Sequence, residues 1–230
     1  AGCSLADSCK AEDLKRYRDE HPGYQVVSYV NTTAAVKALT DVVVTSGNAK
    51  KVIDSFPQDA KLIFGPDYNL GNYINSVTGR QMLLWNGGCH VHEKFSVEAI
   101  VDLKRQHPEA VVMAHLECKA PVLALAEVKG STATMLQYAQ QHPEREYIVA
   151  TEAGILHELR RCCPGTKFHP VPPAVSEGGA GCMCNECEYM KMNTLAKIYN
   201  TLKYEWPAVE VDPAIAKEAV KPIERMLSLS

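Results

Sequence analysis

A pattern of about 85 residues occurs twice in this chain of 230 residues. In each copy a helix-like stretch ends in His-Pro, at His21 and at His107, and an apolar segment follows, over residues 25–30 and 110–115. Two more short apolar segments come next in each copy, and polar residues stand at their ends. Short buried strands that alternate with helices are typical of a parallel sheet covered by helices. The sequence therefore predicts an α/β fold of repeated three-layer parallel-sheet domains related by pseudo-symmetry.

The repeat also predicts how the chain is divided. We expect a first α/β repeat over residues 1–95, a second over 96–180, and a cysteine loop with two helices over 181–230. The helices, expected over Met190–Tyr204 and Pro213–Leu229, have apolar faces that need a partner. Because the sequence contains no third sheet, we expect them to pack on a further α/β domain upstream of residue 1.

Composition argues against several classes of partner. The net charge is −3 and the pI is about 6.3, which does not favour binding to nucleic acid or to a membrane surface. No apolar run reaches the roughly 18 residues that a membrane span needs, and the first residues do not have the pattern of a signal peptide. We expect a cytoplasmic protein that acts on small molecules.

Nine cysteines are the strongest chemical signal in the chain. An odd number excludes a fully paired disulfide framework, and three of them form the run Cys182-Met183-Cys184-Asn185-Glu186-Cys187. Thiolates prefer soft metals, so the run indicates a metal centre, either an iron–sulfur cluster or zinc. A zinc site would need a fourth ligand, for which His169 or Cys162 is available.

Polar residues follow the predicted strands, where α/β proteins bind their ligands. Cys118 ends a strand and is expected to be half-exposed, although a buried cysteine that packs as a small apolar residue is the alternative. Glu152 is either a general acid/base or a carboxylate that stabilises a helix N-terminus. His90 and His92 could bind metal, but two alternating residues on a strand face are more typical of surface or core positions. The other candidates are Tyr29, Asn31, Ser46, Asp67 and Ser131.

Several motifs, taken together, are specific to one family. They include Ala1-Gly2-Cys3-Ser4-Leu5-Ala6, Tyr29-Val30-Asn31-Thr32-Thr33-Ala34, Val44-Thr45-Ser46-Gly47-Asn48-Ala49, Phe64-Gly65-Pro66-Asp67, Gly88-Cys89-His90-Val91-His92, His115-Leu116-Glu117-Cys118, Gly130-Ser131-Thr132 and Ala150-Thr151-Glu152. The chain resembles quinolinate synthase, the iron–sulfur enzyme of NAD biosynthesis, from residue 1 to the last predicted helix.

The resemblance implies three similar domains around a pseudo-threefold axis, two of them complete in this chain, and a [4Fe–4S] cluster. It also implies condensation of iminoaspartate, which L-aspartate oxidase supplies, with dihydroxyacetone phosphate. The implied cluster ligands are Cys3, Cys118 and Cys187, and the implied acid/base is Glu152. The cysteines not expected to bind the cluster are Cys9, Cys89, Cys162 and Cys163. Tyr29 would take part in catalysis and, with Asn31, Ser46, Ser131 and Thr132, in substrate binding.

Two further expectations follow from the resemblance. The pair Cys184 and Cys187 matches a redox-sensitive variant of the family, in which a disulfide would remove one cluster ligand. The upstream domain would complete the substrate pocket. The alternative from another functional class is a non-catalytic iron–sulfur or zinc module that acts as a redox sensor or binds a partner.

Overall fold

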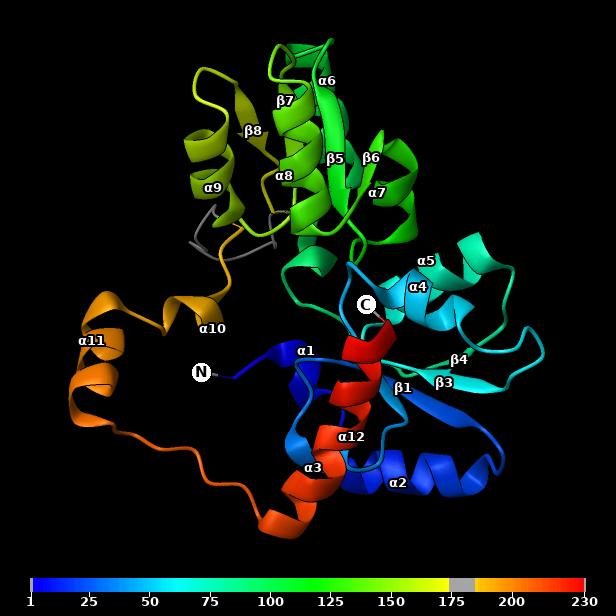
Figure 1. Cartoon of the computed structure of the whole chain (residues 1–230). Coiled ribbons are helices and arrows are strands. Elements are labelled where there is room, and N and C mark those ends of the chain that lie inside the picture. The colour runs from blue at the N-terminus through cyan, green and yellow to red at the C-terminus, as the bar shows by residue number, and fades with distance from the viewer. Residues whose placement is uncertain (1, 174–184, 230) are drawn as a thin grey trace, which may run out of the picture. The chain divides into compact units, whose positions relative to one another are not determined.

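The computed structural model describes residues 2–173 and 185–229, which form two compact units. Unit 1 comprises residues 1–66, 80–87 and 187–230, and unit 2 comprises residues 67–79 and 88–186. Each unit contains one four-stranded parallel sheet with helices beside it, as Figure 1 shows. This confirms the predicted class of repeated α/β domains.

The sheet of unit 1 has the strand order β2-β1-β3-β4. Its core includes Leu14, Val26, Val36 and Ile63, all with at most 1% of their surface exposed, so helices from two places in the chain cover β1 and β3. The strands are β1 (Gln25–Tyr29), β2 (Val42–Val44), β3 (Leu62–Phe64) and β4 (Leu83–Leu84). The first four helices of unit 1 are α1 (Ser4–Asp7), α2 (Ala11–Glu20), α3 (Ala34–Lys37) and α4 (Ala49–Asp54).

The sheet of unit 2 repeats this order as β6-β5-β7-β8. Alternate residues of its strands face opposite sides: Val112 and Ile148 pack under α6 and α7, while Met113 and Val149 pack under α8 and α9. The strands are β5 (Val111–His115), β6 (Val128–Gly130), β7 (Tyr147–Ala150) and β8 (Phe168–Pro170), and the helices are α5 (Tyr68–Thr78), the 3₁₀ helix η1 (His92–Lys94), α6 (Val97–Gln106), α7 (Ala120–Leu125), α8 (Thr132–Gln141) and α9 (Ile155–Cys162).

The division between the units differs from the boundary expected at residue 95. Residues 67–79, which contain α5, and residues 88–95 group with unit 2. The reason lies in packing, because α5 contacts α7 and its Tyr73 lies against the apolar core under α6 and α7. Sequence order alone places α5 with the strands on either side of it.

The last helix packs on the sheet of unit 1. Helix α12 (Pro213–Leu229) packs on β2 and α3 of unit 1 and buries Ala219 and Met226. Arg225 adds to this contact, because its guanidinium lies 4.8 Å from the centre of the Phe56 ring. These contacts give the helix a partner within unit 1, and packing on an upstream domain stays an expectation.

We expect Met226→Ala to lower the free energy of unfolding by about 2 kcal/mol or more, because the substitution leaves a cavity between α12 and the sheet. Leu227, the next residue, is 64% exposed, and Leu227→Ala should change that free energy by less than about 0.5 kcal/mol. Urea denaturation of both variants measures the difference. Equal effects would mean that α12 does not pack on this sheet.

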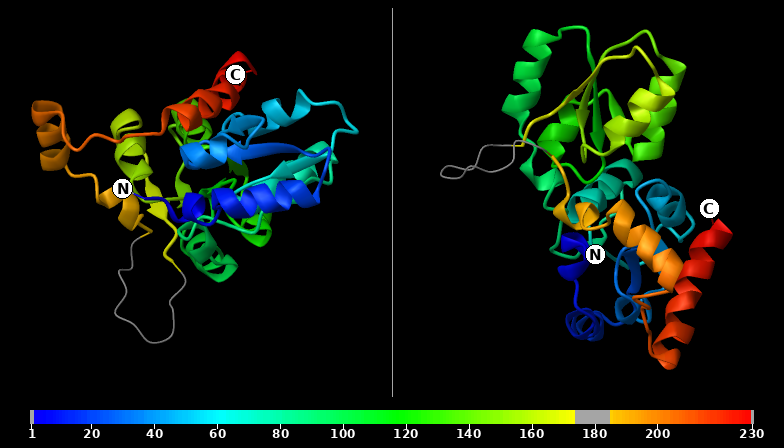
Figure 2. Two further views of the ribbon diagram at one scale, coloured as in Figure 1. Left: turned by 90° about the horizontal axis from the view of Figure 1, so that it is seen from below. Right: turned by 90° about the vertical axis from the view of Figure 1, so that its left-hand side faces the viewer.

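The other predicted helix, Met190–Tyr204, is broken. The structure has α10 (Glu188–Lys191) and α11 (Leu195–Tyr204), and α11 starts afresh at Thr194, whose side chain accepts a hydrogen bond from the Lys197 N–H. No residue of α11 is buried, and Leu195 is 84% exposed. Figure 2 (left) shows α11 standing clear of the unit 1 sheet, so its apolar face is uncovered within the described residues.

Candidate functional site

The carboxyl ends of β1 and β2 position three of the predicted substrate-binding residues. Tyr29 is the last residue of β1, Asn31 lies two residues later, and Ser46 lies two residues after β2. Tyr29 pairs in register with Val44, so both strand ends lie at the same edge of the sheet. Asn31 is exposed at this edge, whereas only 9% of the Tyr29 surface is exposed.

Two of the predicted cluster ligands start helices in unit 1. Cys3 precedes α1 and Cys187 precedes α10, and both side chains are partly exposed. Their loops are neighbours, because a Cβ atom on Gly2 would lie 3.2 Å from the Tyr189 ring. The Asn31 amide nitrogen donates to Cys3 Sγ over 3.8 Å. Unit 1 thus brings together both cysteine loops and one predicted substrate ligand.

A cluster of buried polar side chains lies at the carboxyl edge of the unit 2 sheet, and we call it the His92–Glu117 cluster. His92 Nδ1 is 3.2 Å from Glu117 Oε2, and His92 Nε2 is 3.0 Å from Thr151 Oγ1. The His115 ring stacks on His92 with 4.6 Å between the ring centres. All four residues are buried. Most buried polar side chains in folded proteins have a hydrogen-bond partner.

Cys89 and Asp67 border this cluster. The Cys89 backbone N–H donates to Asp67 Oδ2 over 2.8 Å, and the Leu70 N–H donates to Asp67 Oδ1 over 2.8 Å. The Cys89 thiol, a His92 ring nitrogen and a Glu117 oxygen all lie within 4.8 Å of one another. Cys89 is a partly exposed free thiol. Thiol, imidazole and carboxylate are all metal-ligand types, so this corner of unit 2 can hold a metal.

Burial and mutual charge set the protonation of these groups. Burial raises the pKa of Asp67 to about 7, and Glu117 adds to the rise. Burial by itself would lower the pKa of His92, but hydrogen bonds to Cys89 and Glu117 outweigh it and raise the pKa. Burial lowers the pKa of His115 to about 4, and His92 adds to the fall. The result is a charged His92 paired with Glu117 and stacked on a neutral His115.

Cys118 does not occupy the half-exposed position expected for it. It has 0% of its surface exposed and lies in the apolar core under α6 and α7. Its thiol donates to the Ala150 carbonyl over 3.4 Å, and burial, reinforced by Glu117, raises its pKa. A metal ligand must be a thiolate that reaches the metal. This environment suits the alternative, a cysteine that packs as a small apolar side chain.

The remaining predicted residues of unit 2 start its helices. Ser131 precedes α8, and its hydroxyl accepts a hydrogen bond from the Thr134 N–H, while Thr132 is the first residue of that helix. Glu152 precedes α9 and accepts a hydrogen bond from the Gly154 N–H over 2.7 Å. That contact is the one expected of a carboxylate at a helix N-terminus.

Known proteins similar to this chain point to one enzyme family. A family model described as "Quinolinate synthetase A protein" matches residues 1–228. Quinolinate synthases from Prochlorococcus marinus (strain MIT 9303) and Nostoc sp. (strain PCC 7120) are each 45% identical to the chain; one from Synechococcus sp. (strain PCC 6301) is 44% identical. Each match covers 100% of this chain and 67, 69 and 71% of the three relatives respectively. The chain belongs to the quinolinate synthase family.

The chain is therefore part of an enzyme family of NAD biosynthesis. The family match also bears on the His92–Glu117 cluster of unit 2. Sequence reasoning predicted that Cys89 does not bind the cluster, left metal binding by His92 as the less usual alternative, and gave no role to His115 or Glu117. The structure brings these four residues together. The signal was present, because the motifs Gly88-Cys89-His90-Val91-His92 and His115-Leu116-Glu117-Cys118 were both part of the resemblance. The motifs did not indicate how deeply each residue is buried, and the structure shows that Cys118 is fully buried.

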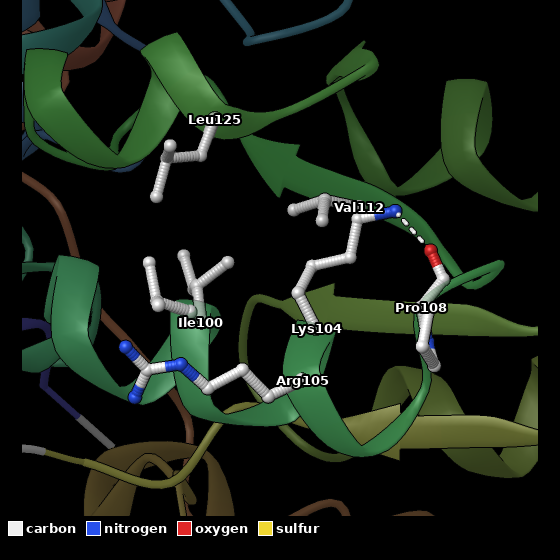
Figure 3. A pocket seen from close by; sticks show the side chains of 7 residues that line it. Ile100, Lys104, Arg105, Pro108, Val112 and Leu125 are labelled. Carbon is white, nitrogen blue, oxygen red and sulfur yellow. Dashed lines mark hydrogen bonds between the residues drawn. The ribbon is translucent and has the colours of Figure 1, made fainter.

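Two other features of this quinolinate synthase family member lie apart from the site. The predicted Cys184–Cys187 disulfide falls partly outside the described residues, because Cys184 does so. A hollow of about 410 Å³ lies on the α6 side of unit 2, and Figure 3 shows its apolar lining of Ile100, Val112 and Leu125. None of the predicted site residues lines it. No described helix is long and apolar enough to cross a membrane.

Proposed function

We propose that the protein is a quinolinate synthase that condenses iminoaspartate with dihydroxyacetone phosphate to form quinolinate. The observation that carries the proposal is the buried His92–Glu117 pair beside the Cys89 thiol, at the carboxyl edge of a parallel sheet. Such an edge is where α/β enzymes bind substrates. A buried ion pair within reach of a possible metal ligand is a candidate for proton transfer during condensation and loss of water.

We further propose that a [4Fe–4S] cluster is bound by Cys3, Cys89 and Cys187. All three are partly exposed, whereas Cys118 is enclosed by apolar side chains. The third ligand therefore moves from Cys118 to Cys89. With three protein ligands one iron stays open, and it would supply Lewis-acid chemistry when the cluster is bound.

Substrate binding is assigned to residues at the carboxyl edges of both sheets. In unit 1 these are Tyr29, Asn31 and Ser46, and Asn31 already contacts the Cys3 thiol. In unit 2 they are Ser131 and Thr132, at the N-terminus of the ten-residue helix α8. The unpaired N–H groups of a first helical turn attract anions. We therefore assign this end of α8 to a carboxylate or phosphate of the substrates.

Proton transfer is assigned to the His92–Glu117 pair. His92, which is charged because Cys89 and Glu117 raise its pKa, can donate a proton to a departing hydroxyl. Glu117 can accept the proton that has to leave carbon. Glu152 was expected to have this role, but its carboxylate accepts a hydrogen bond from the Gly154 N–H, just before α9. Replacing each carboxylate in turn by an amide distinguishes Glu117 from Glu152 as the acid/base.

The function is tested by anaerobic expression of the protein from its own gene. The purified protein is given dihydroxyacetone phosphate and iminoaspartate generated in place by L-aspartate oxidase, and quinolinate is measured by chromatography. We expect a brown protein with about four irons that forms quinolinate only with both substrates. An iron-loaded protein without turnover would favour the sensor module, and zinc without sulfide would favour the zinc module.

The cellular setting follows from the chemistry. Six described cysteines are free, as in a reducing compartment, and we therefore propose that the protein lies in the cytoplasm; they are Cys3, Cys9, Cys89, Cys118, Cys162 and Cys163. An imine hydrolyses in water, and we therefore propose L-aspartate oxidase as the partner that supplies iminoaspartate directly.

We expect oxidation to lower the iron content, because a Cys184–Cys187 disulfide would remove the Cys187 thiolate, and a dithiol reductant to restore it. Cys184→Ser should bind the cluster normally and lose this sensitivity. Iron and sulfide are counted before and after treatment with a mild oxidant. If Cys184→Ser binds no iron, Cys184 is itself a ligand and the redox proposal fails.

A further inference from the structure

Two histidines and a glutamate meet at the amino edge of the unit 2 sheet, the edge opposite to the His92–Glu117 cluster. His107 ends α6, Glu146 directly precedes β7, and His169 lies in β8. His169 pairs with Ile148, which faces α6, and Glu146 lies two residues before Ile148. Residues two apart on a strand share a face, so both side chains lie on the α6 side with His107.

The distances are close to those of a metal site. His107 Nδ1 lies 3.5 Å and His169 Nε2 lies 3.3 Å from the same oxygen, Glu146 Oε2. The two imidazole rings stack with 3.7 Å between their centres, and one ligand atom from each residue lies within 4.8 Å of the other two. Ligand atoms around a tetrahedral zinc ion lie roughly 3.4 Å apart. To bind an ion, the two stacked rings must turn until their nitrogens point to one position.

The three side chains are held in place by contacts outside the group. Lys104 Nζ donates to the carbonyls of Pro108 and Ala110, as Figure 3 shows for Pro108, and this fixes the turn that carries His107. Lys167 Nζ lies 2.5 Å from Glu146 Oε1, which leaves Oε2 for the imidazoles. Supporting contacts of this kind are typical of binding sites that exist before the ligand arrives.

Unit 1 keeps only the first of these three ligands at the equivalent positions, so the fold does not require the Glu146 and His169 side chains. His21 ends α2 as His107 ends α6. Lys61 occupies the place of Glu146, because its carbonyl accepts from Gln25 as that of Glu146 accepts from Val111. Leu83 takes the place of His169 in the strand pairing.

From this geometry we propose that His107, Glu146 and His169 bind a divalent transition-metal ion, such as Zn²⁺ or Ni²⁺. Imidazole is a preferred ligand of these ions, and two imidazoles with one carboxylate occur in known zinc sites. Partial exposure of all three side chains gives the ion a path from solvent. The ion would tie the edge strand β8 and the end of α6 to β7, and the site is independent of the proposed cluster and of turnover.

The test is anaerobic titration of the iron-loaded protein with Ni²⁺ alone, followed by calorimetry. We expect a class of binding sites in the unsubstituted protein that weakens at least about ten-fold in Glu146→Gln and in His169→Gln, the smallest loss usual for a disturbed metal site. Ni²⁺ should also raise the melting temperature of the unsubstituted protein but not of Glu146→Gln, because a ligand stabilises the state that binds it.

His142→Gln is the matched control. His142 also pairs with a carboxylate, Glu144, over 3.8 Å, but it has no second histidine in that pair, and its replacement should leave Ni²⁺ binding unchanged. Circular dichroism confirms that each variant is folded. Equal Ni²⁺ affinity in Glu146→Gln, His169→Gln and the unsubstituted protein would overturn the proposal and leave the group as a hydrogen-bonded structural cluster.

Discussion

Cys89→Ser is expected to yield a colourless protein with little iron and no quinolinate formation. Serine keeps the shape of the side chain but lacks the thiolate that an iron–sulfur cluster requires. The prediction rests on the partly exposed Cys89 thiol, which lies within 4.8 Å of ligand atoms of His92 and Glu117. Iron and sulfide analysis after anaerobic reconstitution measures the effect, and absorption spectra of the same samples show whether any cluster remains.

Cys118→Ser and Cys118→Ala are the controls for this experiment. Cys118 lies in the apolar core and its thiol donates to the Ala150 carbonyl, so both variants should keep their iron, although serine costs some stability in that position. Two variants are used because a misfolded one would be uninformative. Full iron in Cys89→Ser, with loss in folded Cys118→Ala, would restore Cys118 as the ligand.

Glu117→Gln is expected to lower the rate of quinolinate formation by roughly 10²–10⁴-fold, the usual scale for a lost general acid/base. Glutamine keeps the size of the side chain and removes its proton chemistry. It also removes the carboxylate that, after Cys89, does most to keep His92 protonated, so the acid of the pair is weakened together with the base. Single-turnover rates with both substrates measure the change, and the iron content should stay the same.

Glu152→Gln separates the two candidate carboxylates. Because the Glu152 side chain accepts the Gly154 N–H at the start of α9, and a glutamine oxygen can do the same, we expect less than about a ten-fold loss of rate, well below the range for a lost acid/base. A loss of 10²-fold or more in Glu152→Gln, with near-normal turnover in Glu117→Gln, would return the acid/base role to Glu152.

The parallel sheets could be predicted because buried strands leave a strong local pattern. Val111 to His115 are all buried, and five consecutive buried residues between turns indicate a strand covered on both faces. The same reasoning placed Asn31, Ser46 and Ser131 at strand ends, where the structure has them. Strand ends are local properties, and local sequence is sufficient for them.

How deeply a residue at a strand end is buried does not depend on local sequence alone. The expectation that Cys118 is half-exposed was therefore wrong. The chain turns sharply after β5, where the Cys118 N–H donates to the His115 carbonyl over 2.9 Å. This turn directs Cys118 into the core while Glu117 meets His92. The partner of Glu117 comes from a loop 25 positions earlier in the sequence, and no periodicity in either segment indicates that the two meet.

The helices after residue 187 show the same limit. An apolar stripe predicts that a helix packs against another element but does not say which element. In the structure α12 packs on β2 and α3. The break between α10 and α11 was missed because the apolar pattern continues across it, whereas Thr194 starts a new helix through its side-chain hydrogen bond to Lys197.

The path of the chain between the units has a consequence for evolution and for engineering. Strands β3 and β4 are neighbours in one sheet, yet the connection between them runs through α5, which belongs to unit 2. Unit 1 also takes up residues 80–87 and everything after 186. Neither unit is a continuous stretch of sequence, so neither can be excised, swapped or inherited alone by a single cut. Although the two units have the same strand order, as copies of one ancestral domain would, a single recombination event cannot separate one from the other.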